Sequence, residues 1–126
     1  MEWRKHPHEN LDAYKLAKRL VSDLYQLTAA FPSEEKFGLV SQIRRAAVSV
    51  PVNVAEGASR GSKREFSRFL QMARGSVNEL RVLLELSRDL GFLDAGRLEY
   101  FEEILNRLFG MTTGLIRRSN LLSRST

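Results

Sequence analysis

Along most of the chain, apolar residues recur at spacings of three and four, which is the period of one face of an α-helix. The first such segment covers residues 10–31. Asn10 can cap its start, and Pro32 stops its continuation. Its apolar positions are Leu11, Tyr14, Ala17, Leu20, Val21, Leu24 and Leu27. This segment is predicted to be the first helix.

A second segment follows Pro32. Ser33 can cap it, and Glu34 and Glu35 would lie in its first turn, where the helix dipole favours carboxylates. Its apolar stripe consists of Phe37, Val40, Ile43, Ala47, Val50 and Val54. Because the stripe continues past Pro51, we expect a kink there rather than an end. The valines at 48, 50, 52 and 54 alternate as in a strand, but the helical period on both sides favours a helix.

The third and fourth segments carry clearer end signals. Ser62-Lys63-Arg64-Glu65 matches a capping box, so the third helix is predicted to start at about Ser62. It should end at Gly91, since glycine readily adopts positive φ. Asp94 can cap a fourth helix. The apolar positions of that helix are Leu98, Phe101, Ile104, Leu105, Leu108, Met111, Leu115 and Ile116.

Short connections between long helices make consecutive helices antiparallel neighbours. The predicted fold is therefore all-α, an antiparallel up-down-up-down four-helix bundle with the second helix kinked at Pro51. With 126 residues, one domain is expected. Residues 1–9 would form a leader, 10–118 the bundle, and 119–126 a disordered basic tail. Gly75, Gly110 and Gly114 fall inside helices, where they indicate either close helix approach or tolerated imperfections.

The third helix has an apolar arc that spans more than half of its circumference, wider than one core requires. The arc contains Leu86, Met72, Leu83, Phe69, Leu80, Phe66, Leu84 and Leu70. A second copy of the chain is the simplest cover for the excess. The alternative is that a monomer leaves some Leu and Met exposed.

Two charged residues lie within apolar arcs. Arg44 projects between Val40 and Val48, and Glu79 projects between Met72 and Leu86. Since burying either charge alone is costly, we predict a structural ion pair between Arg44 and Glu79, within one chain or between copies. Alternatively, both side chains reach water.

Positive charge is concentrated in the middle of the chain. The sequence has 20 Lys and Arg against 15 Asp and Glu, for a net charge of +5. Cations gather around the predicted start of the third helix, where the dipole disfavours them, so a bound polyanion would relieve the repulsion. The candidate nucleic-acid-binding residues are Arg45, Arg60, Lys63, Arg64 and Arg68. Arg117, Arg118 and Arg124 form a separate cluster on an acid-free tail.

Arg45 also belongs to a polar row on the second helix, formed by Ser41, Arg45, Ser49 and Asn53. The row could follow a phosphate backbone, line a subunit interface or simply face water.

Other chemistry has little support. The absence of cysteine excludes disulfides and thiolate chemistry and fits a cytoplasmic protein. No apolar run approaches the roughly 18 residues that a membrane span needs. His6 and His8 lie in the leader, and no Glu-x-x-His pair exists to hold a di-metal site. The Gly57–Gly61 segment lacks the Gly-Lys-Ser ending of a P-loop. We therefore predict no catalytic residues, no metal and no cofactor, and expect a non-enzymatic protein.

Two central blocks resemble a known family. The first is Gln42-Ile43-Arg44-Arg45-Ala46-Ala47-Val48-Ser49-Val50-Pro51-Val52-Asn53-Val54-Ala55-Glu56-Gly57, and the second comprises Arg60-Gly61-Ser62, Glu65-Phe66, Phe69-Leu70, Ala73-Arg74-Gly75-Ser76 and Glu79-Leu80. Over residues 8–118 the chain resembles the small bacterial four-helix-bundle proteins encoded in intervening sequences of large-subunit ribosomal RNA genes. The resemblance implies a bundle, a ring-like homopentamer in several members, and no catalytic residues. A related branch, the accessory variability determinants of diversity-generating retroelements, forms basic pentamers that contact a reverse transcriptase and nucleic acid.

Together, these features predict a non-enzymatic, cytoplasmic homo-oligomer that binds the RNA or DNA backbone, with a pentamer implied by the resemblance. The alternative is a protein-interaction scaffold that docks a polymerase such as a reverse transcriptase.

Overall fold

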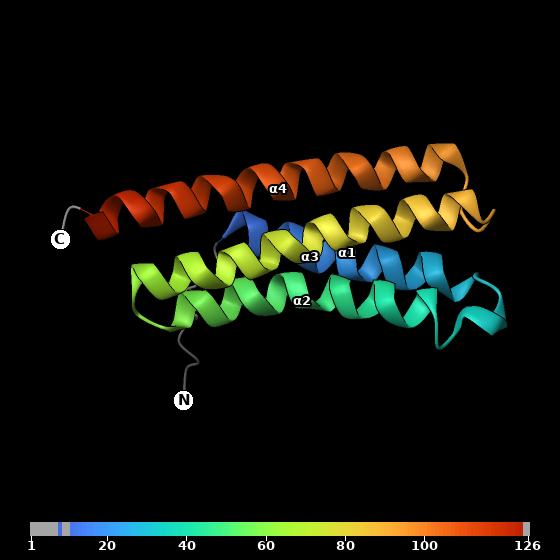
Figure 1. The fold of residues 1–126 in the computed structure, drawn as a ribbon, viewed down its shortest axis with the longest axis horizontal. Helices are drawn as coiled ribbons and strands as arrows, with labels where there is room; N and C mark the ends of the chain where they lie inside the picture. The colour runs from blue at the N-terminus through green and yellow to red at the C-terminus, as the bar shows by residue number, and fades with distance from the viewer. Residues whose placement is uncertain (1–7, 9–10, 125–126) are drawn as a thin grey trace, which may run out of the picture.

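The computed structural model describes residue 8 and residues 11–124, with side chains as far as residue 120. Within this range the chain forms four long helices: α1 (Asp12–Ala29), α2 (Leu39–Ser59), α3 (Lys63–Asp89) and α4 (Ala95–Arg124). A short 3-10 helix, η2 (Ser33–Glu35), lies between α1 and α2, and no strand occurs among the described residues. Consecutive helices run antiparallel (Figure 1), so the predicted up-down-up-down bundle is confirmed.

The core lies along the common axis of the four helices and is filled mainly by leucine, valine and alanine. Five of the described hydroxyl residues are also buried, and three of them, Thr28, Ser87 and Thr112, bond within their own helices. Each donates a hydrogen bond to the backbone carbonyl four residues earlier, at 2.7, 2.8 and 2.8 Å. Because these bonds satisfy the hydroxyls locally, the core accommodates them at low cost.

The predicted caps of α3 and α4 are confirmed. The Ser62 hydroxyl accepts the Glu65 N–H at 3.2 Å, and Asp94 Oδ1 accepts the Arg97 N–H at 2.8 Å. The second half of the capping box does not form, since the Glu65 carboxylate accepts a hydrogen bond from Arg68 instead.

Gly91 ends α3 as predicted. Its φ is +83°, and its N–H bonds to the Arg88 carbonyl at 2.9 Å. The Phe92 N–H bonds to the Ser87 carbonyl, also at 2.9 Å, which completes a Schellman motif. The chain therefore reverses within a few residues and places α4 directly beside α3.

The predicted start of the second helix is wrong. Ser33 opens η2, and α2 begins at Leu39, because Gly38 has a non-helical backbone with φ −109° and ψ −113°. The carboxylate of Glu35 accepts the Leu39 N–H at 3.2 Å and so serves the start of α2. The first helix begins at Asp12 with Leu11 in the cap position, and Asn10 lies outside the described residues.

α2 continues through Pro51, so the valines at 48, 50, 52 and 54 are helical as expected. The helix does not end at the proline, and the kink there stays a prediction.

The prediction of a disordered tail from residue 119 is also wrong, because α4 is helical as far as Arg124. Ser119 is buried, and Asn120 Oδ1 accepts a hydrogen bond from the Ser67 hydroxyl at 2.8 Å. The last turns of α4 therefore pack on the start of α3 instead of leaving the bundle.

Close approach of helices occurs at Gly57 rather than at the glycines singled out from the sequence. Gly57 is buried in α2, where an added Cβ would lie 2.7 Å from Phe69 Cβ and 3.1 Å from Phe66 Cδ1 of α3. At Gly75, Gly110 and Gly114 an added Cβ meets nothing within 4 Å. Within one chain, these three glycines are therefore tolerated imperfections.

None of the described helices has the length and apolar character that crossing a membrane requires.

Gly57→Ala should destabilise the protein, because the overpacking of Phe69 costs about 1–3 kcal/mol, more than the gain of up to about 1 kcal/mol from helix propensity. Gly75→Ala is the matched control in an open helical position, and it should stabilise the fold by up to about 1 kcal/mol. Urea denaturation of both variants measures these changes. A Gly57→Ala variant at least as stable as Gly75→Ala would contradict the close packing of α2 on α3.

Candidate nucleic-acid interface

The turn between α2 and α3 places cations at one end of the bundle. Gly61 has a φ of +74°, which allows a tight connection, and the Ser62 cap then fixes the first turn of α3. Lys63 and Arg64 lie in that turn, are exposed, and make no ion pair with any residue that the structure describes. Neither charge therefore has an ion-pair partner to offset the positive end of the helix dipole.

Arg60 and Arg68 flank this turn, and each of them forms an ion pair with a carboxylate. Arg60 pairs with Glu56 at 3.0 Å, and Arg68 pairs with Glu65 at 2.7 Å. The hydrogen bond from Arg68 lowers the pKa of the Glu65 carboxyl. Desolvation acts against this shift, and the charges of Arg68, Arg60 and Arg64 support it. Exposed pairs of this kind contribute little to stability, so an incoming anion can displace either carboxylate at small cost.

A single aromatic ring orients both of these guanidinium groups. The Cζ atoms of Arg60 and Arg68 lie 5.0 and 4.6 Å from the centroid of the Phe69 ring. Phe69 is buried, and it is the residue that contacts Gly57 of α2. Cation–π attraction therefore holds the two side chains against the rigid α2–α3 packing.

The end of α4 joins the same end of the bundle (Figure 1). The 2.8 Å hydrogen bond from Ser67 to Asn120 places the last turns of α4 beside the first turns of α3. Arg117 and Arg118 are exposed on those turns. The two clusters that look separate in the sequence thus lie at the same end of the bundle, here called the basic end: Arg60, Lys63, Arg64, Arg68, Arg117 and Arg118.

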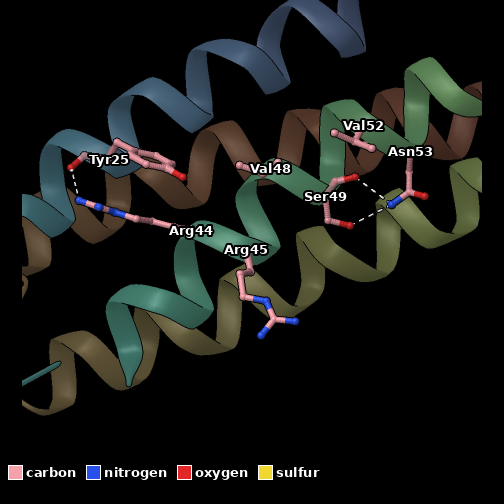
Figure 2. A pocket seen from close by; sticks show the side chains of 7 residues that line it. All are labelled: Tyr25, Arg44, Arg45, Val48, Ser49, Val52 and Asn53. Atoms are coloured by element: carbon pink, nitrogen blue, oxygen red, sulfur yellow. Dashed lines mark hydrogen bonds between the residues drawn. The ribbon is translucent and has the colours of Figure 1, made fainter. Parts of the chain in front are cut away.

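Arg45 is not part of the basic end. It lies on α2 fifteen residues before Arg60, which is about 22 Å along a helix. It borders an open groove of about 510 Å³ on the outer side of α2. Figure 2 shows this groove, which is lined by Tyr25, Arg44, Arg45, Val48, Ser49, Val52 and Asn53.

The polar row on α2 is partly occupied by internal contacts. The hydroxyls of Ser49 and Ser76 lie 2.9 Å apart and join α2 to α3. Asn53 donates to the carbonyl and the hydroxyl of Ser49, at 2.9 Å each (Figure 2). Arg45 remains exposed, whereas Ser49 and Asn53 are half-buried and use their polar groups in these internal contacts.

The predicted pair between Arg44 and Glu79 does not form within the chain. Arg44 Nε donates to the Thr28 hydroxyl at 2.9 Å, and its Nη2 donates to the Tyr25 carbonyl at 3.2 Å. Its Cζ also lies 4.4 Å from the centroid of the Tyr25 ring, as Figure 2 illustrates. Arg44 therefore finds neutral partners on α1, while Glu79 is exposed on α3. A pair between copies stays a prediction.

The apolar arc of α3 is covered mostly by its own chain. Phe69, Leu70, Leu80, Leu83 and Leu84 are buried. Met72 and Leu86 remain 48% and 45% exposed, and the neighbouring residue Val82 is 55% exposed. The exposed apolar surface of α3 is thus a strip formed by Met72, Val82 and Leu86, and it is narrower than the sequence pattern predicts.

The other end of the bundle carries carboxylates. Tyr100 of α4 donates to Asp23 of α1 at 2.9 Å, and this hydrogen bond raises the pKa of the Tyr100 hydroxyl, with burial acting in the same direction. Glu99, Glu102 and Glu103 lie nearby on α4. No group of three or more metal-binding side chains comes together within the described part of the chain.

Comparison with known proteins agrees with this architecture. The family model described as 23S rRNA-intervening sequence protein matches residues 9–114. The chain belongs to this family. No curated protein matches the chain. The predicted membership in the 23S rRNA-intervening sequence family is thus confirmed, and the relation to the accessory variability determinants stays a prediction.

A protein of similar fold with a solved structure gives an independent comparison. It is a protein of unknown function from the S23 ribosomal protein family of Bacteroides thetaiotaomicron, with a TM-score of 0.77 and 20% identity. The similarity covers 83% of this chain and 95% of that one. At this identity, the comparison supports the helical fold alone.

Replacing Arg44 by Ala should cost about 1–2 kcal/mol, since it removes hydrogen bonds from a charged donor and a cation–π contact at a half-exposed site. Glu79→Ala should change stability by less than about 0.5 kcal/mol, and the double variant should show the sum of the two effects. Urea denaturation measures all three. A coupling well above about 0.5 kcal/mol would instead show that the two residues interact between copies.

Proposed function

We propose that this protein is a non-enzymatic, cytoplasmic homo-oligomer that binds RNA or DNA backbones through the basic end. The observation that carries the proposal is that Lys63 and Arg64, in the first turn of α3, are both exposed and form no ion pair with the described residues. Cations in this position raise the energy of the free protein, and a phosphate would lower it. Arg117 and Arg118 of α4 add charge at the same end.

Arg60 and Arg68 can bind phosphate by exchanging their present carboxylate partners for it. Each is held by one exposed carboxylate and by the ring of Phe69. Phosphate can replace Glu56 or Glu65 while the ring keeps the guanidinium in place. The side chains are thus oriented before the ligand arrives, which reduces the entropy lost on binding.

Binding of this kind should depend little on sequence. The ring of Phe69 is 8% exposed, and two guanidinium groups lie against it, so it offers no stacking surface to a base. Arginine and lysine contacts to phosphate give affinity and steep salt dependence without reading bases.

Self-association is supported by the exposed apolar strip. Met72, Val82 and Leu86 lie on one side of α3, and Val48 and Val52 are exposed on α2. A second copy is the simplest cover for these side chains, and a closed ring would bring several basic ends together. The pentamer implied by the family resemblance is part of this proposal.

The alternative is a scaffold that docks a polymerase such as a reverse transcriptase. The groove on α2 favours protein docking, because it combines Val48 and Val52 with the cation Arg45. An acidic protein would then use the cationic surface in place of nucleic acid.

Fluorescence anisotropy with unrelated RNA and DNA oligonucleotides tests nucleic-acid binding. The protein should bind both at about 50 mM salt, with affinity that falls steeply as salt increases. The K63Q/R64Q variant should bind more weakly, and its salt slope should be smaller by about 2, since each phosphate contact contributes about 1.

The control is R88Q/R97Q, which removes the same charge at the other end of the bundle, where both arginines pair with aspartates. It should leave the slope nearly unchanged. Negligible binding of the unmodified protein at about 50 mM salt would reject nucleic-acid binding and favour the docking alternative.

Light scattering tests self-association. The protein should have a mass several times its chain mass of 14.4 kDa, and M72E/L86E should lower that mass. Phe37→Glu is the control, since Phe37 is 89% exposed and lies outside the strip. A 14.4 kDa particle at micromolar concentration would contradict the oligomer.

A further inference from the structure

Acidic residues are missing from both sides of one half of the α3–α4 seam. Residues 66–78 of α3 and residues 104–120 of α4 contain no Asp or Glu. Two hydrogen bonds hold these stretches together, Ser67 to Asn120 at 2.8 Å and Arg74 to Thr113 at 3.1 Å. The half of the seam that adjoins the basic end, here called the acid-free seam, therefore has no carboxylate on either helix.

Arg74 is a positive charge without a carboxylate partner in this seam. Its Nη1 donates to the neutral Thr113 hydroxyl, and its Cζ lies 5.5 Å from the centroid of the Phe109 ring. Neither contact neutralises the guanidinium. The side chain is only partly buried, so its remaining N–H groups can receive an anion.

Arg117 lies across the seam from α3, about one turn closer to the basic end than Arg74. It lies four residues after Thr113 and three before Asn120, so it shares their side of α4. Because Thr113 bonds to Arg74 and Asn120 bonds to Ser67, Arg117 is level with the middle of the Ser67–Arg74 segment. It is exposed and has no ion pair with the described residues.

Neutral hydrogen-bonding side chains fill the space between these cations. Gln71 donates to the Ser67 hydroxyl at 3.3 Å, and Ser67 in turn donates to Asn120. Hydroxyl and amide groups of this kind bond to phosphate and sugar oxygens in nucleic-acid complexes. The seam thus alternates cations with neutral polar groups.

The other half of the seam has the opposite character. Arg81 donates to Asn106 at 2.8 Å, but Glu85 lies one turn further along α3, and Glu102 and Glu103 lie one turn before Asn106 on α4. A polyanion that followed the seam would be repelled from this point on.

We propose that the acid-free seam continues the basic end as a track for a nucleic-acid backbone, with Arg74 and Arg117 as its phosphate contacts. The track rests on the proposed function, which assigns nucleic acid to the basic end. From Lys63 to Arg74 it is about 16 Å long, enough for roughly five nucleotides of one strand. Lys63 and Arg64 hold one end of the backbone, and the ligand leaves the surface before Arg81.

The test compares two double variants with the same net charge. R74Q/R117Q removes both cations of the track. R81Q/R107Q removes one half-exposed and one exposed cation beyond the end of the track, where Glu85, Glu102 and Glu103 begin. Glutamine can still donate to Thr113 or Asn106, so both variants should fold, as circular dichroism and urea denaturation will verify. Anisotropy with the same RNA and DNA oligonucleotides is then measured over a series of salt concentrations.

R74Q/R117Q should weaken binding and reduce the salt slope by about 2, whereas R81Q/R107Q should change the slope by less than about 0.5. Equal losses in the two variants would show that only net charge matters and would overturn the track. If K63Q/R64Q weakens binding while R74Q/R117Q does not, the track is wrong, and binding rests on the other cations of the basic end without Arg117. If the unmodified protein binds neither oligonucleotide, both proposals fail.

Discussion

The register between α3 and α4 determines which charged side chains of this molecule can act together. Three hydrogen-bonded pairs fix it, Ser67 with Asn120, Arg74 with Thr113 and Arg81 with Asn106. Each pair is seven residues from the next on both helices, which is two helical turns. A shift by one turn would break all three pairs at once. It would also move Arg117 by about 5.4 Å along the seam relative to Arg74.

The packing of α2 on α3 has a similar double role at the basic end. Phe69 lies so close to Gly57 that no other side chain fits there. The same ring holds the guanidinium groups of Arg60 and Arg68 on its outer side. A contact that fixes the distance between two helices therefore also places two cations, so the fold and the charged surface cannot vary independently.

The sequence predicts correctly those features that depend on a single helix. Periodicity predicts the four helices, and local signals predict the Ser62 and Asp94 caps and the Gly91 terminus, because these depend on residues within a few positions of each other. The start of α2 was misplaced because the carboxylate of Glu35 and the backbone of Gly38 outweigh the Ser33 signal. Such competition between neighbouring caps is not visible in a pattern.

Contacts between side chains of two different helices could not be predicted from the sequence pattern. The helical periodicity of α2 shows that Arg44 lies on the apolar side of the helix. It does not show that Thr28 and Tyr25 of α1 accept its hydrogen bonds. The arginines at 117 and 118 look like part of a free tail until Asn120 is seen bonded to Ser67. Both errors have the same cause, since a periodic pattern gives the direction of a side chain and not the residue opposite it.

Hydrogen–deuterium exchange of the protein with and without a saturating RNA oligonucleotide tests the central claim most directly, namely that the α3–α4 register assembles one continuous cationic surface. If the surface is continuous, exchange will slow in residues 60–74 and 113–120 together, with no change in residues 41–53 around Arg45 or in residues 85–103. Protection confined to the Arg45 region, or protection of residues 60–74 without residues 113–120, would contradict it.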